Sequence, residues 1–128
     1  LSEPPKVKFS VLYSSLSLYG LPYIAYPHLK LKGFKILKLS KLSFLNQITI
    51  FNNAKFIMGS HGAGFANLIF CKKNTKVLEI KPHNHPNKVY QRISNINNLN
   101  YKLLKLKKIK NHMYGDMILK VKELEKYI

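Results

Sequence analysis

Residues 60–67 combine small side chains with one histidine, in the order Ser-His-Gly-Ala-Gly-Phe-Ala-Asn. They follow the apolar run 56–58, which is typical of a buried strand, and the residues from Phe65 to Phe70 favour a short helix. The first N–H groups of a helix have no partner within it, and the helix dipole adds partial positive charge there. Because glycine lets a phosphate approach the backbone closely, the pattern predicts a phosphate-binding turn.

His61 is the first candidate for chemistry in this turn. An imidazole beside an anion site can donate a hydrogen bond to a phosphate oxygen or transfer a proton. The amides of Gly62, Ala63 and Gly64 would cradle the phosphate, and Ser60 begins the same turn. In the structural alternative, the glycines only shape an ordinary strand-to-helix turn, which His61 fills or caps.

Two further polar residues are candidates for the same site. Asn67 comes three residues after Gly64, so it faces back toward the turn and either braces it or touches a ligand. Glu79 is one of only five acidic residues and lies in the apolar run 76–80, where an unpaired carboxylate is costly to bury. It would either accept hydrogen bonds from a sugar hydroxyl at the sheet edge or pair with a surface lysine.

The triplet His83-Asn84-His85 raises the question of a metal site. A stable zinc site needs three or four ligands, and no cysteine pair, aspartate or second histidine cluster lies nearby in the sequence. We therefore interpret the triplet as a loop and predict no metal site.

Strands are expected to alternate with helices along the chain, which predicts a parallel sheet with right-handed crossovers. The expected strands are residues 7–13, 34–39, 55–59, 76–80 and 101–106. In such sheets ligands bind beyond the carboxyl ends of the strands. The turn 60–64, the end of the Glu79 strand and the loop after Leu39 should therefore share one edge.

Four helices are expected between and after these strands. Ser43 is a suitable N-cap for the first, and residues 64–70 form the second. Apolar residues at helical spacing mark the buried faces of the others, and Asp116 can cap the last. These faces are Phe44, Ile48 and Phe51 in the first helix, Val89, Ile93 and Ile96 in the third, and Met117, Val121, Leu124 and Ile128 in the last.

The chain has 128 residues, 46% of them hydrophobic, and a formal net charge of +17. Such a charge attracts nucleic acid, anionic lipid or nucleotide sugars. However, all but one of the 22 basic residues are lysine, whereas nucleic-acid readers use arginine for its bidentate fork. We interpret the charge chiefly as compositional bias and rank nucleic-acid binding last. One cysteine and no membrane-length apolar run predict a cytoplasmic protein, with contact to a membrane surface left open.

The order of motifs resembles the C-terminal, donor-binding half of the family 61 glycosyltransferases. The motifs are Leu42-Ser43-Phe44, Gln47-Ile48, the His61-Gly62-Ala63-Gly64 loop with Asn67, and the strand Val77-Leu78-Glu79-Ile80. The resemblance extends from about Gly33 to Tyr101. Asn46 replaces a glutamate that is common in the family, and residues 12–32 lack the arginine that its members often carry there.

This resemblance implies a Rossmann-like, three-layer lobe with a mostly parallel sheet, like the C-terminal lobe of a two-lobed, GT-B type transferase. It implies transfer of a sugar, with inversion, from a nucleotide-sugar donor to a glycan, lipid-linked or protein acceptor, without a tightly bound cofactor. It assigns catalytic roles to His61 and Glu79 and donor binding to Ser60, Gly62, Ala63, Gly64 and Asn67.

Residues 1–128 are expected to form a single domain, with a lead-in at 1–32, a core at 33–106, and a basic connector and helix at 107–128. The family's partner lobe would precede this domain, and 128 residues leave no room for it. The chain alone could therefore lack turnover. A non-catalytic module that binds nucleotides or anions is the alternative, and a basic nucleic-acid-binding domain is the second alternative.

Overall fold

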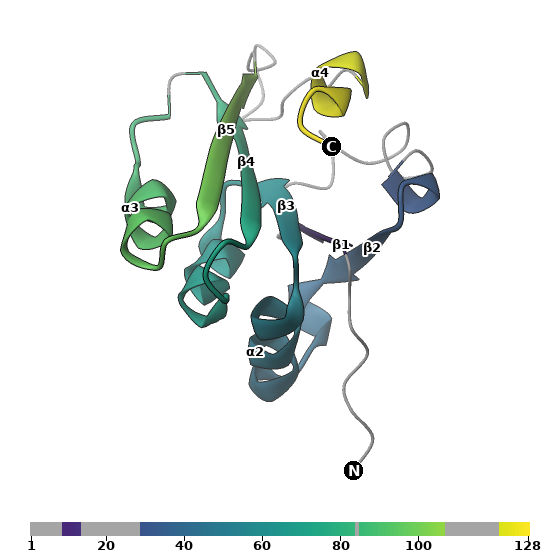
Figure 1. Cartoon of the computed structure of the whole chain (residues 1–128), viewed down its shortest axis with the longest axis vertical. Coiled ribbons are helices and arrows are strands. Elements are labelled where there is room, and N and C mark those ends of the chain that lie inside the picture. Colours follow the sequence, from purple (N-terminus) through teal and green to yellow (C-terminus); the bar gives the residue numbers. More distant parts are fainter. Residues whose placement is uncertain (1–8, 14–28, 84, 107–120) are drawn as a thin grey trace.

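The computed structural model describes residues 9–13, 29–83, 85–106 and 121–128, which form a five-stranded sheet. All neighbouring strands are parallel, in the order β2-β1-β3-β4-β5 (Figure 1). The strands are β1 (Phe9–Tyr13), β2 (Phe34–Lys38), β3 (Phe56–Ser60), β4 (Lys76–Pro82) and β5 (Asn100–Leu106). The predicted α/β class and parallel sheet are confirmed, whereas the GT-B lobe type stays a prediction.

The strand order reverses direction between β1 and β3. The chain passes from β1 outward to β2, then returns past β1 to β3 and continues outward to β4 and β5. At such a switch point the loops after two adjacent strands leave in opposite directions, and the crevice between them is where open α/β sheets bind ligands. The turn that begins at His61 follows β3, so it lies at this position.

Helices cover both faces of the sheet. Among the described residues these helices include α2 (Phe44–Asn53), the 3₁₀ helices η2 (Leu39–Lys41) and η3 (Ala63–Phe70), α3 (Val89–Ile96) and α4 (Val121–Glu125), and residues 29–31 are also helical. Leu124 of α4 packs on one face with Met58, Leu78 and Ile80. Residues of α2, η3 and α3 pack on the other face, in a separate cluster that includes Ile57 and Val77. We call these the α4 face and the α3 face.

The predicted start of α2 is confirmed in atomic detail. The Ser43 hydroxyl accepts a hydrogen bond from the Asn46 N–H at 3.2 Å and so caps the helix. The helix predicted at 64–70 exists, but it is a 3₁₀ helix of eight residues. At three residues per turn, Phe65, Leu68 and Cys71 fall on one line, and all three are buried against the sheet.

Two of the predicted apolar faces were wrong in part. In α2, Phe51 is buried, but Phe44, in the first turn, is 66% exposed and makes an edge contact with the ring of Phe70. In α3, the buried residues are Tyr90 and Ser94, and Ile96 is 78% exposed. The Tyr90 ring packs against Phe65 and so provides a buried contact of this helix that the apolar spacing did not predict.

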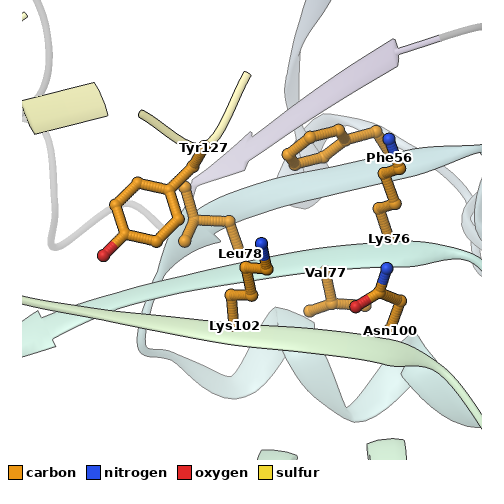
Figure 2. A pocket seen from close by; sticks show the side chains of 7 residues that line it. All are labelled: Phe56, Lys76, Val77, Leu78, Asn100, Lys102 and Tyr127. Atoms are coloured by element: carbon orange, nitrogen blue, oxygen red, sulfur yellow. The ribbon is translucent and has the colours of Figure 1, made fainter. Parts of the chain in front are cut away.

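A cavity of about 140 Å³ lies on the α4 face near the amino ends of the strands. Figure 2 shows its walls, which include the first residues of three strands and the ring of Tyr127. These first residues are Phe56, Lys76 and Asn100. The cavity is therefore at the opposite end of the sheet from His61.

Within the described ranges, the helices are too short or too polar to cross a bilayer. The connector 107–114, the cap Asp116 and Met117 lie outside these ranges, as do most of the lead-in residues.

Candidate functional site

In the turn after β3, three consecutive backbone N–H groups have no acceptor among the described residues. The His61 N–H extends the sheet by donating to Ile80 O at 2.8 Å. The next N–H that bonds within the turn is that of Phe65, which donates to Gly62 O at 3.0 Å. Among the described residues, the N–H groups of Gly62, Ala63 and Gly64 therefore have no acceptor, as expected at the start of a helix.

Gly64 holds η3 close to the loop that follows β2. A Cβ atom at Gly64 would lie 2.6 Å from Leu39 Cδ1, a distance that side chains do not tolerate without a shift. Gly62 is different, because its backbone is extended and any residue could adopt that conformation. The glycine at position 64 thus brings the predicted loops after β2 and β3 together at one edge.

Glu79 is completely buried and lies beside this turn. His61 Nδ1 lies 2.5 Å from Glu79 Oε2, and the Tyr101 hydroxyl donates to Glu79 Oε1. Glu79 is paired with Gly59 in the neighbouring strand, and a glycine there has no side chain to compete for this space. The alternative that Glu79 pairs with a surface lysine is wrong.

The pairing with Glu79 fixes how His61 presents its ring. A carboxylate can only accept hydrogen bonds, so His61 Nδ1 carries the proton that joins the two groups. Nε2 is then the ring atom left for a ligand. The His61 side chain is 14% exposed, compared with 1% for Glu79, so only the imidazole is within reach of a substrate.

Asn67 and Gln47 form a brace between α2 and η3. The Asn67 amide Nδ2 donates to Gln47 Oε1 at 2.8 Å. Gln47 Nε2 in turn donates to Leu39 O at 3.0 Å and Leu42 O at 3.2 Å. Asn67 is buried, so the structure shows it in the bracing arrangement, one of the two that the sequence left open.

Ser60 does not join His61 and Glu79. Side chains alternate along a strand, so Ser60 shares the α4 face with Phe56 and Met58 of β3. Its hydroxyl is buried and has no hydrogen-bond partner among the described residues. Only the backbone at Ser60 contributes to the turn.

Three aromatic side chains complete the site, and sequence reasoning assigned none of them to it. The ring of His61 lies 4.2 Å from that of His85 and 4.9 Å from that of Tyr90, between centroids. Tyr101 reaches Glu79 from β5. Burial raises the pKa of Tyr101, and the hydrogen bond to Glu79 raises it further, so the phenol keeps its proton.

Sequence signals for these residues were weak. His85 was visible only as part of the triplet tested as a metal site, and Tyr101 only as the start of a strand. Among the described residues there is no group of three or more histidine, cysteine or acidic side chains that could hold a metal ion. The position of Tyr101 follows from the register of β4 and β5, in which Val77 pairs with Tyr101 and Glu79 with Leu103, whereas His85 and Tyr90 come from the segment after β4.

Comparison with known families gives this geometry a context. Residues 25–78 match the family model described as glycosyltransferase 61. The match includes the brace residue Gln47 and the whole turn at 60–67, and it ends just before Glu79. It confirms the predicted resemblance over this segment and supports a glycosyltransferase domain in general. Curated proteins gave no significant match to the chain.

Proposed function

We propose, from the glycosyltransferase 61 match, that this protein supplies the donor-binding part of a glycosyltransferase. It would transfer a sugar from a nucleotide-sugar donor to a hydroxyl group of a glycan, a lipid-linked saccharide or a protein. The observation that carries this proposal is the turn after β3. There an imidazole fixed by a buried carboxylate adjoins three N–H groups without acceptors among the described residues.

The proposed reaction is an inverting displacement at the anomeric carbon. The acceptor oxygen forms a bond to this carbon as the bond to the diphosphate breaks, and the diphosphate leaves with the electron pair. Negative charge therefore grows on the leaving phosphate oxygens. Fixed N–H donors aimed at that position stabilise the transition state more than the ground state.

His61 would contribute to the same stabilisation through Nε2. With its proton on Nε2 as well as Nδ1, the imidazolium places a positive charge next to the leaving diphosphate. Glu79 keeps the charge of the ion pair balanced within a buried site, and it stays too deep to touch the substrate itself. Glu79 thus acts through His61 as a positioning residue, a narrower role than a direct catalytic one.

The acceptor hydroxyl needs a base, and the described acidic side chains are not placed to provide it. Apart from Glu79, the acidic residues described are Glu123 and Glu125. Both belong to α4, which packs on the other face of the sheet. We infer that the described carboxylates do not supply this base and that the described part of the domain handles the donor.

The same observation favours one alternative, a module that binds a nucleotide without turning it over. Both proposals predict binding of nucleoside diphosphates, helped by the net charge of +17. They differ in turnover, because only the transferase consumes a donor sugar when an acceptor is present. A nucleic-acid-binding domain would instead bind arbitrary DNA or RNA, with an affinity that falls steeply with salt.

Isothermal titration with UDP, GDP and their sugars, followed by a transfer assay with acceptor mixtures, tests the proposal. His61→Ala should lower the transfer rate by about 10²–10³-fold, the effect of removing one transition-state donor. His83→Ala is the matched control, since His83 is an exposed histidine that follows β4. A folded protein that binds none of these nucleotides contradicts the proposal, and binding without transfer supports the non-catalytic module.

A further inference from the structure

His85 belongs to the segment that connects β4 to α3, and several hydrogen bonds are formed within this segment. The His85 N–H donates to Pro82 O at 3.1 Å. Lys81 Nζ reaches across the loop and donates to Asn87 O at 2.8 Å. Asn87 Oδ1 accepts from the Val89 N–H at 2.9 Å and so ties the loop to the start of α3. These hydrogen bonds fix the backbone around His85, and its ring contacts that of His61.

The hydrogen bonds of His85 determine which ring nitrogen carries its proton. The Asn87 N–H donates to His85 Nδ1 at 3.3 Å, so Nδ1 presents a lone pair. In a neutral imidazole the proton is then on Nε2, which is a donor. In His61 the roles differ, because its Nδ1 carries the proton bonded to Glu79.

Burial and the charges around His85 favour its neutral form. Burial lowers the pKa of His85, and the nearby positive charges of His61 and Lys81 lower it further, against the opposing effect of Glu79. Lys81 is itself buried, with 3% of its surface exposed. The ring is thus a neutral donor in surroundings that are rich in positive charge and suited to an anion.

We propose that His85 is a second ligand-binding residue, whose Nε2–H donates to a phosphate oxygen of the donor's diphosphate next to His61. This inference rests on the proposed function, because it assigns the diphosphate to this site. Three features carry it: the 4.2 Å distance between the two imidazole rings, the tautomer set by Asn87, and the half-buried position of His85. A histidine that only filled space would not need a fixed donor at the surface.

Two substitutions distinguish the effect of the N–H donor of His85 from the effect of its ring. His85→Phe keeps a flat ring against His61 but removes the Nε2–H donor, whereas His85→Gln keeps an N–H donor at a similar reach. Titration of the intact protein with UDP and GDP should give about tenfold weaker binding for His85→Phe, the loss of one hydrogen bond to a charged group. His85→Gln should stay within about threefold of the wild type. His83→Phe is the matched control and should bind like the wild type.

Nitrogen NMR of the histidine rings measures the protonation of each ring nitrogen in the wild-type protein and so provides an independent test. In the wild type, His85 should show a protonated Nε2 and an unprotonated Nδ1, and addition of UDP or GDP should shift the Nε2 signal.

The possible outcomes distinguish the two proposals. If the wild type binds neither nucleotide, the proposed function fails and this inference fails with it. If the wild type binds but folded His85→Phe binds equally well, or if Nε2 does not respond, the inference alone is overturned. Weaker binding of His85→Phe with rescue by His85→Gln supports it.

Discussion

The two faces of β4 bury different kinds of side chain. On the α4 face the strand contributes Leu78 and Ile80, which pack among other apolar side chains. On the α3 face the same strand contributes Val77, Glu79 and Lys81. All five side chains are buried, and among these five only Glu79 and Lys81, both on the α3 face, can be charged.

The comparison shows that burial in this sheet does not by itself mean a structural role. A buried carboxylate is costly unless hydrogen bonds and an opposite charge compensate, and Glu79 obtains both from His61 and Tyr101. An apolar residue of similar volume would fill this position more simply. Such a pair lies beside three N–H groups without acceptors among the described residues, so the proposed binding site is on the α3 face, whereas the α4 face packs apolar side chains.

The largest stability effect is expected on the α4 face. Leu78→Ala removes a side chain that is 1% exposed, so the free energy of unfolding should fall by about 2–5 kcal/mol. Urea unfolding measures this change. The affinity of the folded variant for UDP or GDP should match that of the wild type, and a parallel loss of affinity would show that the two faces are not independent.

A smaller stability effect, now accompanied by a change in binding, is expected on the α3 face. Tyr101→Phe removes one of the two donors to the buried Glu79, which should cost about 1–3 kcal/mol of stability. Since Glu79 holds His61, nucleotide affinity should fall as well. Tyr127→Phe removes a hydroxyl on the α4 face and should change the stability by about 0.5 kcal/mol or less. Equal effects of the two substitutions would contradict the assignment of roles to the faces.

The smallest effect concerns the dry part of the α3 face, where Cys71 is buried. Burial raises the pKa of the Cys71 thiol from 9.0 to about 12. The folded state therefore holds this proton more tightly than the unfolded state, so its contribution to stability is complete below pH 9 and declines as the pH rises toward 12.

Between neutral pH and pH 10, titration of this thiol should lower the free energy of unfolding of the wild type by about 1 kcal/mol. Cys71→Ala should not show this decrease. The thiol should also react slowly with Ellman's reagent at pH 8 in the folded protein. Rapid reaction would mean that water reaches this face well beyond the site around His61.

The strands and the turn were predictable because local patterns specify them. Short apolar runs between polar turns predicted β3 and β4, and Ser43 marked the start of α2. The buried faces of α2 and α3 were not predictable in the same way. Helical spacing alone favoured Phe44 and Ile96, but burial depends on what lies opposite, and both side chains are mostly exposed in the described part of the structure.

Sequence by itself determined that a strand, a glycine-containing turn and a helix would follow one another around His61, because these features depend on neighbours in the chain. Only the tertiary structure decided which partners the polar residues would have. Parallel pairing brought Glu79 beside Gly59 and one strand away from Tyr101, and the loop after β4 brought His85 onto His61. Register and chain crossover place residues that are 18 to 24 positions apart within hydrogen-bonding or ring contact, and no local pattern encodes that placement.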